Sequence, residues 1–298
     1  MKAALIGSTK IAEIHLRELI ANGCKEITII SRDRNKANQL IKKFKFYNKI
    51  KFFNSQINIL KKKKFNIIDI CSNTDFHLKH INYIPKFSGT IIVEKPIFSL
   101  IKYNKNYLHI LTKIYKKHKK IYVCYPMKYF AKIILSKFKF KKKISKFKVN
   151  YHTSGKHFES EIGLDLLPHA ISITSEIFKD SNFNEKKIIN NFVKTNKHKW
   201  NSKTTYEKLK IYYNFSENKK RKKSQFSLQI DEKKLTRYTK KINHLFYNYI
   251  KFNNEKISVD NPMKIMFKDF FKNIKKVKFF NDNRKLTYLI MNQMHNLL

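Results

Sequence analysis

Cysteine, glycine and proline are scarce in this sequence of 298 residues, which contains three cysteines, five glycines and five prolines. The cysteines (Cys24, Cys71 and Cys124) are odd in number and lack metal-ligand spacing, which argues against a disulfide framework and a cysteine-based zinc site. We therefore expect buried free thiols in a reducing compartment. No apolar run is long enough to cross a bilayer, and residues 1–7 read as a strand rather than a signal peptide. We expect a soluble, cytoplasmic protein with no membrane partner.

Arginine and acidic residues are also scarce. Of 65 basic residues six are arginine and 59 are lysine, and only 21 residues are acidic, which gives a net charge of +44. A nucleic-acid surface would use arginine, the better bidentate ligand of phosphate and guanine. The abundance of Lys, Asn, Ile, Phe and Tyr instead indicates an A/T-rich genome, with lysine filling exposed positions. We expect no specific nucleic-acid partner, because net charge bears on solubility and non-specific binding more than on fold.

The first part of the chain alternates strand and helix patterns. Hydrophobic residues make up 42% of the sequence, as in a folded globular protein. Apolar runs predict strands at 3–6, 26–30, 51–53, 67–71, 90–93 and 121–123, with helices at 11–20, 35–44, from 75, and at 99–118. Continuous apolar strands joined by helices predict a doubly wound parallel sheet, covered on both faces. We expect residues 1–124 to form a Rossmann domain of the α/β class.

After residue 124 the strands are grouped together. The patterns predict helices at 127–137 and 165–178, strands at 147–152, 188–193, 209–215, 225–230 and 235–238, and closing helices at 262–274 and 284–298. Lysine-rich stretches at 61–64, 139–143 and 219–223 are read as solvated loops. Grouped strands predict that residues 125–298 form an α+β domain with a mostly antiparallel open sheet, its last helices packing back on the first domain.

The loop after the first expected strand has the position of a dinucleotide phosphate loop. In a dinucleotide fold the pyrophosphate lies at the N-terminus of the helix that follows. Read as G-x-G-x-x-A, the segment keeps Gly7 and Ala12 and has Thr9 at the middle glycine. The alternative is a plain strand–helix turn. The expected cofactor contacts in this loop are Gly7, Ser8, Thr9, Lys10 and Ile11.

The end of the second expected strand bears on cofactor choice. An NAD site usually carries an acidic residue there for the ribose hydroxyls, whereas the chain reads Ser31-Arg32-Asp33. A hydroxyl and a guanidinium suit a 2′-phosphate, by charge and by bidentate hydrogen bonding. We therefore expect NADP, with NAD as the alternative, and Ser31 and Arg32 as ligands. The alternative for these two residues is an exposed helix start with Ser31 as its cap.

Two further motifs carry proton-transfer groups. Glu94-Lys95-Pro96 follows the apolar run 90–93, and Pro96 favours a turn that leaves Lys95 at the carboxyl end of a strand. Asp165 and His169 are four residues apart, so on a helix they share one face. Each has a plainer interpretation: Asp165 as an N-terminal helix charge, and His169, after Pro168, as a helix-start histidine.

These segments together resemble the Gfo/Idh/MocA oxidoreductases, a family that includes glucose–fructose oxidoreductase and inositol dehydrogenase. Their order and spacing match from residue 1 to about 178, and the tail from Asn261 resembles the family's closing helices. Departures are Thr9 at a family glycine, Asn73 where many members have proline, and Lys128 where arginine is frequent. The resemblance rests on Ile6-Gly7, Ile11-Ala12, His15-Leu16, Ser31-Arg32-Asp33, Asn73-Thr74-Asp75, His77, Val93-Glu94-Lys95-Pro96, Gly163-Leu164-Asp165 and His169.

The resemblance implies hydride transfer between a nicotinamide cofactor and a carbon that bears a hydroxyl. It implies that Lys95 contacts the nicotinamide ribose and substrate, that His169 exchanges the hydroxyl proton, and that Asp165 assists. It also implies an open second sheet that often forms an oligomer interface, so we consider a homo-oligomer through that sheet. Further cofactor contacts that it implies are Ser72, Asn73, His77 and Glu94.

The expected function is thus an NADP-preferring oxidoreductase that acts on a sugar, polyol or related small molecule, with no metal. Lysine and histidine fit this chemistry, because a neutral imidazole can take the hydroxyl proton and an ammonium stabilises the alkoxide. Two alternatives stay open. One is an imine or enone reductase in a biosynthetic pathway, and the other is a catalytically silent nucleotide-binding homologue in which Thr9 has cost turnover.

Overall fold

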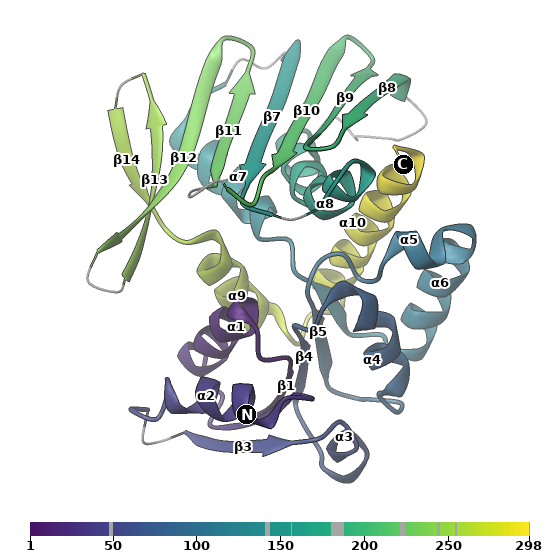
Figure 1. Ribbon diagram of the computed structural model, residues 1–298, viewed down its shortest axis with the longest axis vertical. Coiled ribbons are helices and arrows are strands. Elements are labelled where there is room, and N and C mark those ends of the chain that lie inside the picture. The colour runs from purple at the N-terminus through teal and green to yellow at the C-terminus, as the bar shows by residue number, and fades with distance from the viewer. Residues whose placement is uncertain are drawn as a thin grey trace. The chain divides into compact units, whose positions relative to one another are not determined.

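The computed structural model describes residues 1–47, 50–140, 144–155, 157–179, 188–220, 224–242, 245–253 and 255–297. The chain forms two units, one of residues 1–124 with 266–288 and one of residues 125–265 with 289–298. Each unit has its own sheet (Figure 1), and the two units are described separately. The lysine-rich stretches at 139–143 and 219–223 fall partly outside the described residues.

The first unit is built on a six-stranded sheet in which every pair of neighbours is parallel, with the order β3-β2-β1-β4-β5-β6. Its strands are β1 (Lys2–Ile6), β2 (Glu26–Ile30), β3 (Lys51–Ser55), β4 (Ile67–Ile70), β5 (Thr90–Val93) and β6 (Ile121–Val123). This confirms the expected doubly wound sheet. The order reverses between β1 and β4, and such a switch point at the carboxyl ends of the strands is where these folds bind ligands.

Helices cover both faces of this sheet, with α1 and α2 on one side and α4 to α6 on the other (Figure 1). They are α1 (Lys10–Ala21), α2 (Arg34–Lys42), α3 (Ile59–Lys62), α4 (His77–Tyr83), α5 (Leu100–Tyr103) and α6 (Tyr107–Lys117), with 3₁₀ turns η1 (Thr74–Phe76) and η2 (Asn104–Asn106). Two predictions were wrong. The loop expected at 61–64 begins inside α3, and the helix expected at 99–118 is divided at η2, where asparagines favour turns over a helix interior.

Residues 266–288 complete the first unit. They lie in α9 (Pro262–Asn273) and α10 (Val277–Asn296), and α10 begins seven residues before the expected start at 284. The rings of Phe270 and Phe279 each lie 5.1 Å from the ring of Tyr122 in β6. The Asn283 side chain donates to the carbonyl of Val123 at 3.0 Å and accepts its N–H at 2.8 Å. One asparagine therefore occupies the free hydrogen-bonding edge of β6.

The second unit is built on an eight-stranded sheet with the order β14-β13-β12-β11-β7-β10-β9-β8. Its strands are β7 (Lys146–Thr153), β8 (Ile188–Asn196), β9 (Lys199–Tyr206), β10 (Leu209–Glu217), β11 (Gln225–Ile230), β12 (Lys233–Ile242), β13 (Leu245–Phe252) and β14 (Glu255–Val259). Among the described strand pairs of this sheet, only β7 and β10 are parallel, which confirms a mostly antiparallel sheet. The sequence patterns did not predict β9, β13 and β14.

The helices α7 (Pro126–Lys137) and α8 (Ser160–Ile177) belong to the same unit. Helix α8 approaches the sheet closely at Gly163, where an added Cβ would lie 2.8 Å from the buried ring of Trp200 in β9. Other side chains of the sheet form polar contacts: Asn214 donates to Asn150, which donates to Ser227, each at 3.0 Å. The helix begins five residues before the expected start, so Asp165 and His169 lie inside it rather than at its N-terminus.

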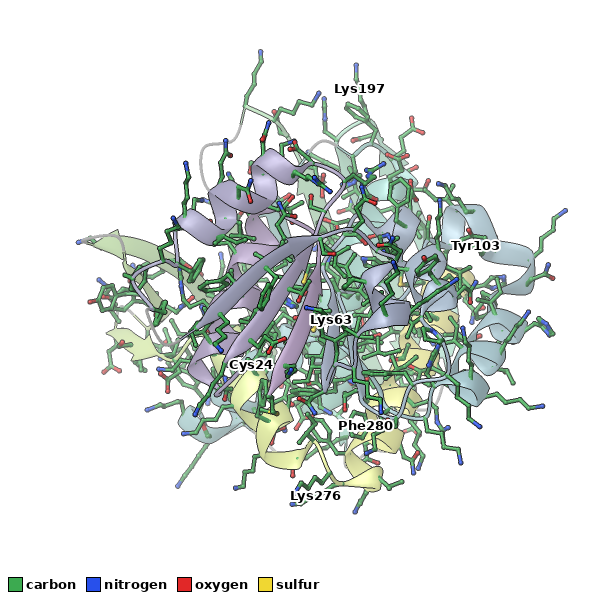
Figure 2. The ribbon with its side chains drawn as sticks, turned by 90° about the horizontal axis from the view of Figure 1, so that it is seen from below. Cys24, Lys63, Tyr103, Lys197, Lys276 and Phe280 are labelled. Atoms are coloured by element: carbon green, nitrogen blue, oxygen red, sulfur yellow. The ribbon has the colours of Figure 1, made fainter. Side chains whose placement is uncertain are left out.

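Lysine side chains dominate the outside of the protein. Figure 2 shows long side chains ending in nitrogen that extend away from the ribbon, among them the exposed Lys197 and Lys276. None of the helices in the described ranges combines the length and apolar character that a membrane span requires.

Candidate active site

The turn after β1 depends on Gly7. Its φ is +129°, and an added Cβ would lie 2.8 Å from the carbonyl oxygen of Cys71, the residue that follows β4. Its N–H donates to the carbonyl of Ile30 at the end of β2. A side chain is therefore excluded both by backbone conformation and by contact. The absence of that side chain lets the loop lie directly against the end of β4, at the switch point of the sheet.

The loop leads into the N-terminus of α1. Thr9 is the N-cap residue and its side chain makes no capping hydrogen bond. Thr9 and Lys10 are exposed, while Ile11 is half-buried. The first N–H groups of a helix have no partner within the helix and carry a partial positive charge, which favours phosphate. An uncapped helix start beside a glycine turn therefore fits a dinucleotide pyrophosphate.

The expected adenosine end of the site joins two loops. The hydroxyls of Ser8 and Ser31 lie 2.9 Å apart, so the loops after β1 and β2 are in contact. Arg32 is exposed, and its guanidinium lies 4.6 Å from the centre of the Phe76 ring. Phe76 carried no signal in the sequence. This ring now gives Arg32 a cation–π contact that holds it beside Ser31.

The helix α2 is capped by Asp33 and not by Ser31, the cap considered in the alternative interpretation. The Asp33 carboxylate accepts the backbone N–H of Lys36 at 3.0 Å and pairs with its ammonium at 3.3 Å. Chiefly the hydrogen bond from that N–H lowers the pKa of Asp33 below its ordinary value. The Asp33 carboxylate is therefore already occupied by contacts within α2.

The loop after β4 holds three predicted cofactor ligands. The Ser72 hydroxyl lies 2.9 Å from Nδ1 of His80, and the Asn73 side chain accepts the N–H of Asp75 and begins η1. His77 is buried, with Nδ1 2.9 Å from the carbonyl of Pro96 and Nε2 2.9 Å from the carbonyl of Ser72. Burial lowers the pKa of His77, and the two carbonyls oppose this effect only in part. His77 therefore joins the loops after β4 and β5.

Glu94 and Lys95 lie at the carboxyl end of β5. Glu94 is buried, and its Oε1 lies 2.8 Å from Nε2 of His15. Its Oε2 accepts the backbone N–H of Lys95 at 3.2 Å. Lys95 is half-buried and precedes a cis peptide bond to Pro96. The glutamate of the motif thus points inward, and its carboxylate holds the backbone of the lysine that follows.

His15 is a second buried histidine, whose only signal in the sequence was the family resemblance. It is 0% exposed, and its Nδ1 lies 2.9 Å and 3.0 Å from the two oxygens of the Asp69 carboxylate. Burial alone would lower the pKa of His15, but the charges and hydrogen bonds of Asp69 and Glu94 outweigh it and raise the pKa to about 10. His15 is therefore an imidazolium at neutral pH.

The three cysteines are buried free thiols, as expected. Burial raises the pKa of Cys24 to about 11 and that of Cys71 and Cys124 well above the ordinary thiol value. Because the thiolate is the reactive form, these side chains are inert at neutral pH. The Cys71 thiol donates to Asp69 at 3.4 Å.

Asp165 and His169 lie on α8, in the second unit. Both are half-buried, and the His169 ring lies 5.7 Å from the ring of Tyr151 in β7. Their spacing places them one helical turn apart on the same face. Pro168 lies inside the helix, so the interpretation of His169 as a helix-start residue was wrong. Lys95 belongs to the first unit, and its meeting with Asp165 and His169 stays a prediction.

Two residues near Asp165 carried no sequence signal. Glu217, at the end of β10, is 1% exposed and accepts both the backbone N–H and the Nδ1–H of His157, at 2.9 and 3.0 Å. Ligand atoms of His157, Asp165 and Glu217 lie within 4.8 Å of one another. The hydrogen bond to Glu217 raises the pKa of His157, against the effect of burial. The pair therefore adds a polar, proton-binding group beside Asp165 that only the fold reveals.

Residues 1–125 match a family model described as "Oxidoreductase family, NAD-binding Rossmann fold". This range holds the whole of the loop, sheet and strand-end geometry of the first unit up to β6. A search of curated proteins gives no match to the sequence.

Solved structures share the fold over nearly the whole chain. Biliverdin reductase from Synechocystis, solved with biliverdin and NADP⁺, is 8% identical with a TM-score of 0.66, covering 99% of this chain and 97% of its own. UDP-N-acetylglucosamine 3-dehydrogenase from Acidithiobacillus ferrooxidans is 10% identical with a TM-score of 0.66, covering 98% and 96%. An oxidoreductase from Agrobacterium radiobacter, solved with NAD⁺, L-tartaric acid and magnesium, is 12% identical with a TM-score of 0.63, covering 97% and 94%. At these identities the likeness is one of fold.

Proposed function

The first 125 residues belong to the Gfo/Idh/MocA oxidoreductase family as its NAD-binding Rossmann domain, and from this premise we propose that the chain is an NADP-preferring oxidoreductase. Its reaction is hydride transfer between a nicotinamide and the hydroxyl or carbonyl carbon of a sugar, polyol or related small molecule. The relatives in fold act on or bind different compounds, including a nucleotide sugar, tartaric acid and biliverdin. The substrate therefore has to be found by assay.

The observation that carries the proposal is the joint position of Gly7 and Lys95 in the first unit. Gly7 lets the phosphate loop lie against the end of β4, and Lys95 stands at the end of β5, the next strand. A nicotinamide dinucleotide, when bound, supplies the hydride acceptor or donor. The uncapped start of α1 binds its pyrophosphate, and the strand ends that follow hold its nicotinamide side.

The NADP preference is supported by the residues after β2. Asp33, which by its place near the end of β2 could bond a ribose hydroxyl, instead caps α2 and pairs with Lys36. Ser31 and Arg32 are left to meet the 2′ position, and a guanidinium binds phosphate in a bidentate, charge-assisted manner.

The reaction roles rest on charge and titration. The Lys95 ammonium stabilises the alkoxide that develops as the hydride leaves or arrives. His169 takes or returns the hydroxyl proton, since imidazole titrates near neutral pH. Asp165, one turn away on the same helix face, orients that imidazole. His157 and Glu217 add polar groups beside Asp165. Such groups would suit a substrate that carries several hydroxyls.

Two measurements test the function. The first is a fluorescence titration with NADPH and NADH, where we expect saturable binding of both and tighter binding of NADPH. A protein that binds only polyanions would show no saturation with either. The second is turnover over a panel of sugars, polyols, imines and enones, with Lys95→Ala and His169→Ala as test variants.

We expect each of these two variants to lose about 100-fold or more in kcat. The matched control is Lys62→Ala, which removes one exposed lysine from α3. Saturable NADPH binding without turnover of any panel member would instead support the silent nucleotide-binding homologue. A preference for imines or enones would identify the biosynthetic reductase.

A further inference from the structure

The buried imidazole of His15 connects three separate parts of the first unit. It comes from α1, one turn after the phosphate loop, and lies between Asp69 of β4 and Glu94 at the end of β5. It is separated by 54 residues from Asp69 and by 79 from Glu94. The Phe267 ring of α9 packs edge-on against it at 4.9 Å.

Both ring nitrogens of His15 face carboxylates. The distances of 2.9 Å to Asp69 and 2.8 Å to Glu94 are those of charge-assisted hydrogen bonds. A neutral imidazole can donate from one nitrogen only, so satisfying both carboxylates requires the imidazolium. The raised pKa of His15 agrees with this geometry. The ring is thus a fixed double donor whose orientation is set by two partners.

The bond to Glu94 continues to the next residue. Oε1 of Glu94 is bound by His15, and Oε2 accepts the backbone N–H of Lys95. A carboxylate held at one oxygen has its other oxygen placed as well, because the group is planar and rigid. The direct hydrogen-bonded path therefore runs from the His15 ring to the Lys95 backbone.

The other flank of Lys95 is held independently. His77 lies 2.9 Å from the carbonyl of Pro96, and its second nitrogen lies at the carbonyl of Ser72. Lys95 consequently stands between two fixed points, the carboxylate of Glu94 before it and the carbonyl of Pro96 after it. Of these two points, only the first depends on an ion pair.

A purely structural purpose would not explain the arrangement. Burying one imidazolium with two carboxylates costs desolvation free energy, and well-packed apolar side chains often stabilise such a position equally well or better. The charged cluster also fixes the orientation of the Glu94 carboxylate, because hydrogen bonds are directional.

We infer that His15 is a positioning residue for the reaction, acting through Glu94 to hold Lys95 at the carboxyl end of β5. This inference rests on the proposed function in one respect, namely that Lys95 is the amine that acts on substrate. The hydrogen-bonded path itself is independent of any reaction.

The test compares His15→Gln with His118→Gln. His118 is a buried histidine of the same unit that is not hydrogen-bonded to Asp69 or Glu94, so it reports the general effect of losing a buried imidazole. Hydrogen–deuterium exchange of the cofactor-free protein reads the Lys95 amide directly. We expect His15→Gln to increase that exchange about tenfold, the factor for one lost hydrogen bond, and His118→Gln to leave it at the wild-type rate.

Kinetics give the second readout. We expect His15→Gln to lower kcat about tenfold or more, while the Kd for NADPH changes less than about threefold, because the phosphate loop is intact. Glu94→Gln should lower kcat similarly, and the double variant should lose no more than either single variant, because all three break the same path. Should His15→Gln fail to fold, Glu94→Gln carries the same exchange and kinetic readouts.

The inference is overturned if the Lys95 amide exchanges at the wild-type rate in His15→Gln, or if His118→Gln gives the same increase. It is also overturned if the losses from His15→Gln and Glu94→Gln add in the double variant. A wild-type protein without turnover would contradict the proposed function alone, and the exchange experiment would still decide whether His15 holds Lys95.

Discussion

The carboxylate of Asp33 accepts the backbone N–H of Lys36 at 3.0 Å, and this contact makes the acidic residue after β2 the cap of its own helix. In the cofactor site that we propose, the groups left after β2 are therefore a hydroxyl and a guanidinium, from Ser31 and Arg32. The Arg32 guanidinium already lies over Phe76, so the binding of a phosphate, as we propose, would cost it little side-chain freedom.

Arg32→Ala should therefore weaken NADPH far more than NADH. We expect the Kd for NADPH to rise about 10- to 100-fold, as for a lost charge-assisted hydrogen bond, and the Kd for NADH to change less than about threefold. Fluorescence titration of both cofactors measures this. Arg34→Ala, which removes an exposed arginine two residues away, is the matched control. Equal losses for the two cofactors would remove the NADP assignment.

Gly7 and Gly23 form a matched pair of positive-φ glycines. A Cβ at Gly7 meets the carbonyl of Cys71 at 2.8 Å, whereas a Cβ at Gly23 meets nothing within 4 Å. Gly23→Ala should cost only the conformational strain, about 1 kcal/mol. Gly7→Ala should cost about 2–4 kcal/mol, because backbone has to move as well, and should abolish NADPH binding.

Urea unfolding followed by circular dichroism, together with NADPH titration, compares these two variants. Equal losses of stability would show that the contact with Cys71 is not what requires glycine in the loop.

The pH dependence of stability should report His15. Its pKa is raised in the folded protein to about 10 from an ordinary value of 6.5. A raised pKa contributes stability that is complete below pH 6.5 and is lost as the pH rises toward 10. The free energy of unfolding should therefore fall between pH 7 and pH 9 by up to about 1.4 kcal/mol per pH unit.

His15→Gln should show a flatter profile over the same range and a lower stability at pH 7, by about 3–5 kcal/mol, because it leaves two buried carboxylates without their partner. Cys71 and Cys124 face the same carboxylates but remain neutral, since their pKa values lie well above the ordinary thiol value. Parallel profiles for the two proteins would contradict an imidazolium at this position.

Gly163→Ala should destabilise the second unit, although alanine favours helix. The added Cβ would lie 2.8 Å from the ring of Trp200, which is 0% exposed and stacked on Phe215 at 5.3 Å. Overpacking of this kind costs about 1–3 kcal/mol, which exceeds the gain of up to about 1 kcal/mol in helix propensity. Trp200 is the only tryptophan of the chain, so its fluorescence during urea unfolding reports this unit. An unchanged or higher midpoint would contradict the close approach of α8 to β9.

The strands of the first unit were predictable because buried parallel strands are short continuous apolar runs. The expected bounds of β2, β5 and β6 are the observed ones. Helix α8 was predicted too short because it begins in polar residues, Ser160 and Glu161, which carry no apolar pattern. Local pattern thus located elements reliably where burial on both faces made the pattern unambiguous.

The hairpins of the second unit were harder to predict from the sequence. The turns between β9 and β10, β11 and β12, and β13 and β14 contain Glu207, Asp231 and Asn253 in the left-handed region, with φ of 54°, 50° and 45°. Glycine is the usual sequence signal for such turns, and this chain contains only five glycines. Without that signal, β9, β13 and β14 were not separated from loop.

The candidate site divides in the same way. The Gly7 turn and the Glu94-Lys95-Pro96 motif are local, so their places at the ends of β1 and β5 could be predicted from spacing. The contacts of His15 with Asp69 and Glu94, and of His157 with Glu217, join positions 54 to 79 residues apart. Such pairs form only when distant segments of the chain meet in the fold, so a local sequence pattern does not predict them.

Asn283 has a consequence for biosynthesis. It occupies the edge of β6, yet the ribosome delivers it about 160 residues after that strand. During synthesis this edge of the Rossmann sheet therefore stays open while residues 125–265 of the second unit are translated. A gene truncated at codon 124 would release a polypeptide with that edge permanently exposed, and we would expect it in inclusion bodies.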